Sequence, residues 1–376
     1  MAATKNNTKD DSKGVQPKYN RVIGIDIGNG LLNIRSITNE GRNYSLTLPS
    51  AFAFYKDVGA AVSSKELDVS KFEIEGSEYA WGEEIRKISK LQYSYGHENR
   101  YRTDAYIVMV KIALARAYMD LGIKQNDKVL IVTGVPSGET GTMREQEIEA
   151  AFLGTNVDDP KSKPVIHDVV VDGNQMYFKV DAVKVLPQAL STVLGRYLDL
   201  EGMVEDDDYE EMKVAVIDIG GGTTDLDIVD NLRRLNEYQS IPRGFRDVYN
   251  AIREQITNDL PGHQVSDYKL LEVLEEGKEQ KEYIYRPSKR VDGVNFTNTF
   301  NRTVREMSME IQELVTSTWK DHSDIDEVLL VGGGAHHFEQ HITRIITGIT
   351  IPNNNGSSNV EGYYRYGIYK ISEDDE

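Results

Sequence analysis

The chain has 376 residues, of which 39% are apolar and 28% are charged, and its 43 basic and 61 acidic side chains give a formal net charge of −18. This length and balance suit two globular domains, and the negative charge argues against a surface that grips nucleic acid directly. The sequence holds no cysteine, which excludes disulfides, thiolate nucleophiles and cysteine metal sites and agrees with a cytoplasmic location.

The two ends of the chain are polar. Residues 1–20 are rich in Asn, Lys and Asp, so they predict a disordered tail and lack the apolar core of a signal peptide. Residues 373–376 read Glu-Asp-Asp-Glu, which argues against a basic amphipathic anchor. No apolar run approaches the ~18 residues of a membrane span, so we expect no contact with membrane.

The first predicted elements form a hairpin. An apolar run at 22–27 leads into the Gly-Asn-Gly turn 28–30, and a second apolar run follows at 31–37. Asn and Gly tolerate the positive φ that tight turns require, so the two runs predict paired strands. A third strand is expected at 44–48, whereas 51–102 carries mixed signals and receives no assignment.

The middle of the chain predicts one buried helix followed by strands. Residues 103–121 are apolar on almost every face, which is typical of a buried helix, and Gly122 is its expected cap. Residues 128–133 predict a buried strand. A further hairpin is expected at 169–180, turning through the Asp-Gly-Asn sequence 172–174.

The hairpin pattern then recurs. An apolar strand at 213–219 runs into the Gly-Gly-Gly-Thr-Thr turn 220–224, and a returning strand follows at 225–229. Each copy is followed by helices and by a later buried strand, at 129–132 and at 328–331. An internal duplication of one α/β unit explains both copies. The acidic run 205–211 lies between them and is expected to be an exposed loop.

Three glycine turns follow buried strands, at 28–30, 220–222 and 332–334. Glycine lets the backbone bring its N–H groups close to a phosphate, and a nearby carboxylate, Asp26 or Asp218, can hold a divalent cation. Alternative interpretations stay open for two of these turns. The first could be a plain hairpin, and the glycines of the third could serve tight packing of a strand against a helix. None of the turns fits the P-loop or the Rossmann fingerprint.

The order of these motifs resembles the superfamily of actins, DnaK-type chaperones and sugar kinases. The matching residues are Asp26-x-Gly28-x-Gly30, then Asp218-x-Gly220-Gly221-Gly222-Thr223-x-Asp225, then Gly332-Gly333-Gly334. They correspond to the first phosphate loop, the second phosphate loop and the adenosine loop of that superfamily. Segments 185–189 and 359–364 resemble its two interdomain crossovers, so the resemblance spans about residues 21–370.

The resemblance implies an α/β fold of duplicated actin-like (ribonuclease H-like) domains, with mixed sheets flanked by helices and a nucleotide in the interdomain cleft. Domain I would comprise 21–186 plus 357–372, with a smaller subdomain at about 38–100. Domain II would comprise 187–356, with a smaller subdomain at about 231–300.

The resemblance also assigns roles to residues. Asp26 and Asp218 would act in catalysis and hold Mg²⁺ through water, while Gln188 would orient the water that attacks ATP or GTP. An alternative also stays open for Gln188, namely that it only makes a hydrogen bond between the domains. Contacts to the ribose and base are unassigned, since Glu276, Lys278 and Glu279 are equally typical of a solvated helix. The expected nucleotide-binding residues are Gly28, Asn29, Gly30, Gly220, Gly221, Gly222, Thr223, Thr224, Gly332, Gly333 and Gly334.

Within the superfamily the chain most resembles the ParM-type plasmid-segregation actins. It has no room for a chaperone's substrate-binding domain, and residues 130–136 (Leu-Ile-Val-Thr-Gly-Val-Pro) resemble a ParM segment. Such proteins form filaments with bound nucleotide and move plasmid DNA through a ParR-type adaptor bound to the centromere. A small-molecule kinase and a nucleotide-gated binding protein without hydrolysis stay open as alternatives.

Overall fold

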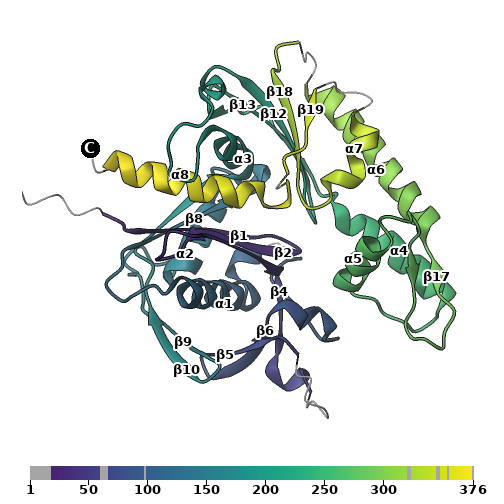
Figure 1. Cartoon of the computed structure of the whole chain (residues 1–376), viewed down its shortest axis with the longest axis horizontal. Coiled ribbons are helices and arrows are strands. Elements are labelled where there is room, and N and C mark those ends of the chain that lie inside the picture. The colour runs from purple at the N-terminus through teal and green to yellow at the C-terminus, as the bar shows by residue number, and fades with distance from the viewer. Residues whose placement is uncertain are drawn as a thin grey trace, which may run out of the picture.

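The computed structural model describes residues 18–59, 67–96, 99–319, 323–343, 348–353 and 355–374. The disordered tail predicted for 1–20 lies outside this part of the chain, apart from residues 18–20. The chain forms two bodies of sheet and helix, and the C-terminal helix lies between them (Figure 1). The predicted α/β architecture with mixed sheets and flanking helices is therefore confirmed.

The first body is built on a mixed sheet with the strand order β11-β8-β1-β2-β3. Strand β1 pairs antiparallel with β2 and parallel with β8, and β8 pairs parallel with β11. The predicted first hairpin and the strand after it are confirmed. The strands are β1 (Arg21–Ile27), β2 (Leu31–Ile37), β3 (Asn43–Pro49), β8 (Val129–Val135) and β11 (Ala182–Pro187).

Helix α1 (Asp104–Leu121) fills the space between this sheet and the next, and most of its apolar residues are buried. The side chain of Thr103 caps its first turn, because the hydroxyl oxygen accepts a hydrogen bond from the backbone N–H of Tyr106. Gly122 ends the helix with φ of 59°. The predicted buried helix and its glycine cap are confirmed. Helix α2 (Met143–Leu153) follows β8.

The second sheet has the order β10-β9-β5-β6-β4-β7 and draws on two separate parts of the chain. One part is the unassigned segment 51–102, and the other is the predicted hairpin, which turns through Asp172 and Gly173 at φ of 49° and 81°. The domain and subdomain boundaries given above stay predictions. The elements are β4 (Ala51–Phe54), β5 (Ser70–Ile74), β6 (Ser77–Trp81), β7 (Gln92–Tyr93), β9 (His167–Val171) and β10 (Asn174–Phe178), with 3-10 helices η1 (Tyr55–Asp57), η2 (Glu83–Lys87) and η3 (Arg100–Arg102).

The second body repeats the pattern of the first, since β12 pairs antiparallel with β13 and parallel with β18, which confirms the duplication. Its sheet runs β14-β13-β12-β18-β19, with β15 also on β13, and helices supply the rest of its apolar core. The elements are β12 (Lys213–Ile219), β13 (Thr224–Asp230), β14 (Arg233–Arg234), β15 (Gln239–Ile241), β16 (Ile284–Tyr285), β17 (Val294–Asn295), β18 (Glu327–Val331), β19 (Ile349–Thr350), α4 (Phe245–Asp259), α5 (Asp267–Glu276), α6 (Thr297–Thr318) and α7 (Ala335–Ile342).

Two helices cross where the bodies meet, α3 (Gln188–Tyr197) and α8 (Ser358–Asp374), and Figure 1 shows α8 running past α3. Their backbones approach so closely that a Cβ atom added to Gly362 would lie 1.7 Å from the carbonyl oxygen of Ser191. Helix α3 continues directly from β11, and α8 also packs on β1 and β8. The crossing therefore joins the sheet of the first body to the second body.

The acidic run 205–211 is largely exposed, as predicted, but it is not a plain loop. It contains the 3-10 helix η5 (Asp207–Glu210), and Tyr209 within it is buried. The Tyr209 hydroxyl donates a hydrogen bond to the carboxylate of Glu327 at 2.6 Å, so one aromatic anchor holds an otherwise exposed acidic segment. Among the described helices, none combines the length and the apolar character that crossing a membrane requires.

Candidate functional site

The two hairpins of the duplicated units end in closely similar turns. The backbone N–H of Gly28 donates to the carbonyl oxygen of Leu31, and that of Gly220 donates to Thr223, each at 2.9 Å. The residue two before each glycine is an aspartate near the end of a buried strand. Each body thus presents a carboxylate directly beside a glycine turn.

These two turns face one another across the boundary between the bodies. A Cβ atom added to Gly221 would lie 3.2 Å from the Cβ of Asn29, and one added to Gly222 would lie 2.7 Å from the Asn29 amide nitrogen. Side chains at these two positions would push the turns apart. The glycines of the second turn therefore allow the Asn29 side chain to sit between the two loops.

The third glycine cluster lies against the second turn. Gly332 has φ of 100°, and a Cβ atom there would lie 2.2 Å from the carbonyl oxygen of Ile219 and 2.7 Å from Oδ1 of Asp218. Only glycine fits a position with both restrictions. The cluster leads directly into α7, and its backbone lies beside the Asp218 carboxylate.

One cavity gathers almost all the residues that the sequence singled out. Of that set, Gly222 and Thr224 do not line it. Thr224 is fully buried, and its hydroxyl donates to the carbonyl oxygen of Arg243 at 2.9 Å. Successive residues of an extended chain point to opposite sides, so Thr223 faces the cavity and Thr224 faces away from it. The lining includes Asp26, Gly28, Asn29, Gly30, Gln188, Asp218, Gly220, Gly221, Thr223, Gly332, Gly333 and Gly334.

Asp218 is held by a chain of polar side chains from the crossing helices. The hydroxyl of Thr192 on α3 donates to Oδ1 of Asn359 on α8 at 2.7 Å. The amide nitrogen of Asn359 donates in turn to Oδ2 of Asp218 at 3.3 Å. This chain fixes the orientation of the carboxylate and ties it to the helix crossing.

Asp26 has a matching arrangement in the first body. The hydroxyl of Thr47 donates to Oδ1 of Asn33 at 2.8 Å, and the Asn33 side chain is hydrogen-bonded to Asp26. Asn33 lies opposite Asp26 in the β1–β2 register. Two carboxylates from two bodies are thus each positioned by an asparagine that a threonine orients.

The carboxylates in this region resist ionisation. Burial raises the pKa of Asp26 to about 6, although the charge of Arg100 and the Asn33 hydrogen bond act in the opposite direction. Burial likewise raises the pKa of Asp218 to about 6 and that of Asp225 to about 7. Asp225 is buried, and the Ser240 side chain partly offsets the effect of burial on its pKa. A divalent cation would favour the ionised forms, so the donor set fits one.

Gln188 begins α3 immediately after the end of β11, and its side chain lines the cavity. The side chain of Tyr363 on α8 lies next to it and is fully buried. Burial, followed by the charges of Asp26 and Asp218, raises the pKa of Tyr363 above its usual range, so the phenol stays protonated. Gln188 is therefore held at the edge of the acidic region by a neutral neighbour.

Two known families match the two halves of the chain. The N-terminal domain of actin-like proteins matches residues 24–190, and the C-terminal domain of the MreB-like archaeal actin homologues matches residues 216–344. This chain is an actin-like protein. The superfamily resemblance of the glycine turns is thereby confirmed, and the cavity lies where the two matched regions meet.

Solved structures similar to this actin-like protein cover nearly its whole length. The apo pSK41 ParM protein shares 20% identity at a TM-score of 0.68, covering 95% of this chain and 99% of its own. An archaeal actin homolog, Ta0583, in complex with ADP shares 18% identity at 0.62, covering 91% and 97%. A 15-stranded ParM filament from Clostridium botulinum shares 17% at 0.65, covering 93% and 99%. These likenesses show the fold, and no curated protein sequence matches the chain.

The cavity of this actin-like protein also contains residues that sequence reasoning missed. Tyr268 on α5 donates from its hydroxyl to the carbonyl oxygen of Gly30 at 2.9 Å, and Arg246 on α4 stacks its guanidinium 3.9 Å from the centre of the Tyr95 ring. Both contacts span the two bodies. Arg100 of η3 reaches the first glycine turn. Nothing in their local sequence marks these residues, because contacts between segments far apart in the chain bring them to the cavity.

The wall near the third glycine cluster is lined by Tyr249, Leu271 and His336. These three residues come from α4, α5 and α7, respectively. Glu276, Lys278 and Glu279, which the sequence left open as contacts, do not line the cavity.

Proposed function

We propose that this actin-like protein is a nucleoside triphosphatase that binds ATP or GTP with Mg²⁺ in the cavity between its two bodies. The supporting observation is that Asp26 and Asp218, one from each duplicated unit, stand beside opposed glycine turns on a single cavity. A clamp of this kind offers backbone N–H groups to phosphates from two sides and carboxylates to their counter-ion.

In this proposal Asp26 and Asp218 hold the hydrated Mg²⁺, which would offset phosphate charge when bound. Gly28–Gly30, with Gly220, Gly221 and Thr223, cradle the phosphates, and Gly332–Gly334 accept the nucleoside. Gln188 orients the attacking water, since an amide can position a water but is too weak a base to take its proton. The two bodies must close for Gln188 to meet the phosphate end of the nucleotide.

We further propose that the protein assembles into filaments whose subunit contacts favour the closed state and so promote hydrolysis. The solved relatives include a ParM filament, which supports self-assembly as the function to test. The finer role proposed is plasmid segregation in the cytoplasm through a ParR-type DNA-binding adaptor. A net charge of −18 favours an adaptor over direct contact with DNA.

The decisive experiment combines light scattering and pelleting with phosphate release, using Mg²⁺ with ATP or with GTP, on the wild-type chain and on Asp218→Ala. We expect assembly above a threshold concentration, faster turnover once assembly begins, and loss of turnover in the variant. Equal turnover per subunit below and above the threshold would contradict the coupling. Turnover that needs an added acceptor, without assembly, would favour a small-molecule kinase.

A further inference from the structure

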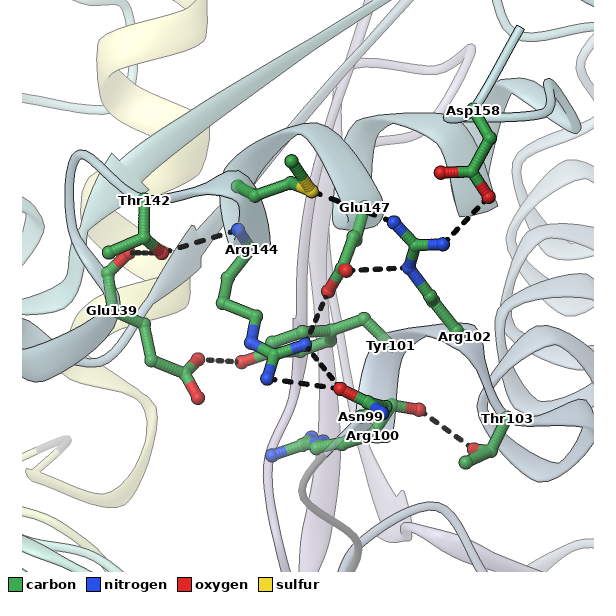
Figure 2. Close-up of polar contacts among 11 residues, drawn as sticks. Asn99, Arg100, Tyr101, Arg102, Thr103, Glu139, Thr142, Arg144, Glu147 and Asp158 are labelled. Atoms are coloured by element: carbon green, nitrogen blue, oxygen red, sulfur yellow. Dashed lines mark hydrogen bonds and ion pairs between the residues drawn. The ribbon is translucent and has the colours of Figure 1, made fainter.

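The 3-10 helix η3 directs three consecutive side chains to three different places (Figure 2). A 3-10 helix has three residues per turn, so successive side chains point about 120° apart. Arg100 points to the first glycine turn, and the hydroxyl of Tyr101 donates to the carboxylate of Glu139. Arg102 points to α2, where it donates from Nε to Oε1 of Glu147 at 2.6 Å.

Arg100 lines the cavity with hydrogen-bond donors to spare. Nη1 donates to Oδ1 of Asn29 at 3.0 Å, and Nη2 donates to the carbonyl oxygen of Ile27. A guanidinium has five N–H donors, so these bonds leave three of them. The Nε–H is buried and meets no acceptor among the described residues. The rings of Tyr101 and Tyr106 lie 5.3 and 5.6 Å from the guanidinium and limit its movement.

Arg100 acts electrostatically on Asp26 but does not form an ion pair with it. Arg246, the other arginine in the lining, lies 3.9 Å from the carboxylate of Asp267. No described carboxylate forms an ion pair with Arg100, whose bonds go to an amide and a backbone oxygen. A half-buried guanidinium with unused donors beside a phosphate loop suits a phosphate oxygen, which it can bind through two N–H groups at once.

We propose that Arg100 contacts the terminal phosphate of the bound nucleotide and stabilises the charge that develops there during hydrolysis. In that reaction the water oxygen bonds to the γ-phosphorus and the bond to the bridging oxygen breaks. The electron pair stays on the nucleoside diphosphate, both protons of the water leave with the inorganic phosphate, and Arg100 remains protonated throughout. This inference rests on the proposed triphosphatase function.

The outer side of η3 explains how Arg100 is held in place (Figure 2). Glu147 on α2 is buried and uses both carboxylate oxygens, since Arg144 donates to Oε2 at 2.8 Å while Arg102 occupies Oε1. Arg102 also donates to Asp158 at 2.8 Å. Glu147 is therefore a positioning residue, which fixes η3 against α2 so that Arg100 faces the glycine turn.

The test uses Arg100→Ala and Arg100→Lys in the full chain, with Arg86→Ala as a control for an exposed arginine of the same region. Affinities for ADP, for ATP and for ADP with aluminium fluoride are measured by calorimetry with Mg²⁺, and turnover is measured by phosphate release. We expect kcat of the alanine variant to fall on the order of 10²–10³-fold, with a comparable loss for the aluminium fluoride complex. ADP affinity should change little, and lysine should restore part of the loss.

Equal losses of ADP affinity and of turnover in Arg100→Ala would overturn the proposal, because they would show that Arg100 only shapes the loop. Unchanged turnover would overturn it as well. Glu147→Gln should lower kcat while leaving the ADP affinity unchanged. If the wild-type chain binds nucleotide without hydrolysing it, the proposed function fails. In that case the contact between Arg100 and the terminal phosphate is tested by binding alone: Arg100→Ala should remove the preference of the protein for ATP over ADP.

Discussion

Tyr268 and Gly30 join the two bodies of the molecule by a direct hydrogen bond, in which the phenolic hydroxyl donates to the carbonyl oxygen at 2.9 Å. Tyr268 is buried, and it lies on α5 of the second body, whereas Gly30 closes the first glycine turn of the first body. The bond links the two bodies at the first glycine turn, which forms part of the proposed phosphate site. Any opening of the cleft that releases nucleotide must break it.

Replacing Tyr268 with Phe removes only this hydroxyl. One hydrogen bond contributes about 0.5–1.5 kcal/mol, so we expect a fluorescent ATP analogue to dissociate a few-fold to about tenfold faster. Stopped-flow displacement measures this rate. Tyr95→Phe is the matched control, because its contact with Arg246 is made by the ring and its hydroxyl has no hydrogen bond in the described part of the chain. Identical rates for Tyr268→Phe and wild type would show that the bond does not limit release.

Asn359 links the helix crossing to Asp218, so its replacement tests the proposed cation site. Asn359→Ala takes the amide donor from Asp218 and leaves the Thr192 hydroxyl without its acceptor. Loss of such an orienting partner typically lowers metal affinity by about 10–100-fold. We expect the Mg²⁺ concentration that half-saturates nucleotide binding to rise by that factor.

Thr192→Ser is the control for Asn359→Ala, since serine retains the hydroxyl donor and should leave the Mg²⁺ titration unchanged. Asn33→Ala should produce a similar shift through Asp26. A normal Mg²⁺ dependence in both asparagine variants would contradict the assignment of Asp26 and Asp218 to the cation.

Gly362 permits the close crossing of α3 and α8, and an alanine there places its Cβ 1.7 Å from the carbonyl oxygen of Ser191. We expect Gly362→Ala to lower the free energy of unfolding by at least about 1–3 kcal/mol, because the helices must separate. Gly195→Ala is the graded comparison, with its nearest contact at 3.2 Å. Its strain is offset by the roughly 1 kcal/mol that alanine gains over glycine in a helix.

Denaturant unfolding followed by circular dichroism measures both glycine variants. Equal stabilities for Gly362→Ala and Gly195→Ala would mean that the crossing can relax without cost. A lower stability of Gly362→Ala alone would identify the crossing as a rigid joint between the bodies.

The sequence predicted the parts of the fold that local signals encode. The hairpins around Gly28 and Gly220 combine apolar strands with glycine turns, and the buried helix ending at Gly122 carries its own cap. These features depend on residues close together in the chain. Because the strand–turn–strand pattern occurs twice, the second copy supports the prediction made from the first. The same turns pointed to Asp26 and Asp218 as neighbours of a common ligand.

The remaining part of the candidate site depends on contacts between distant segments. Arg100 lies in a short 3-10 helix within the unassigned segment, and it reaches Asn29 only because the second sheet folds beside the first. Tyr268 lies on an ordinary amphipathic helix. Strand alternation could have shown from the sequence that Thr223 and Thr224 do not both line the cavity, since neighbouring strand residues face opposite sides.

His337 offers a test of the cavity wall by pH. Its ring stacks on Phe245 with centroids 5.1 Å apart, and it lines the cavity beside the third glycine cluster. Burial, with smaller contributions from His336 and Lys278, lowers the pKa of His337 to about 3. The unfolded chain binds a proton at this histidine below about pH 6.5, whereas the folded chain does not.

The contribution of His337 to the free energy of unfolding therefore falls as the pH drops below about 6.5, by up to about 1.4 kcal/mol per pH unit. His337→Phe keeps an aromatic ring against Phe245 and removes the titration. We expect wild type to lose up to about 2 kcal/mol more than the variant between about pH 7.5 and about pH 5, measured by urea unfolding. Parallel losses in the two proteins would show that His337 takes up its proton in the folded state. The wall beside the third glycine cluster would then be open to water.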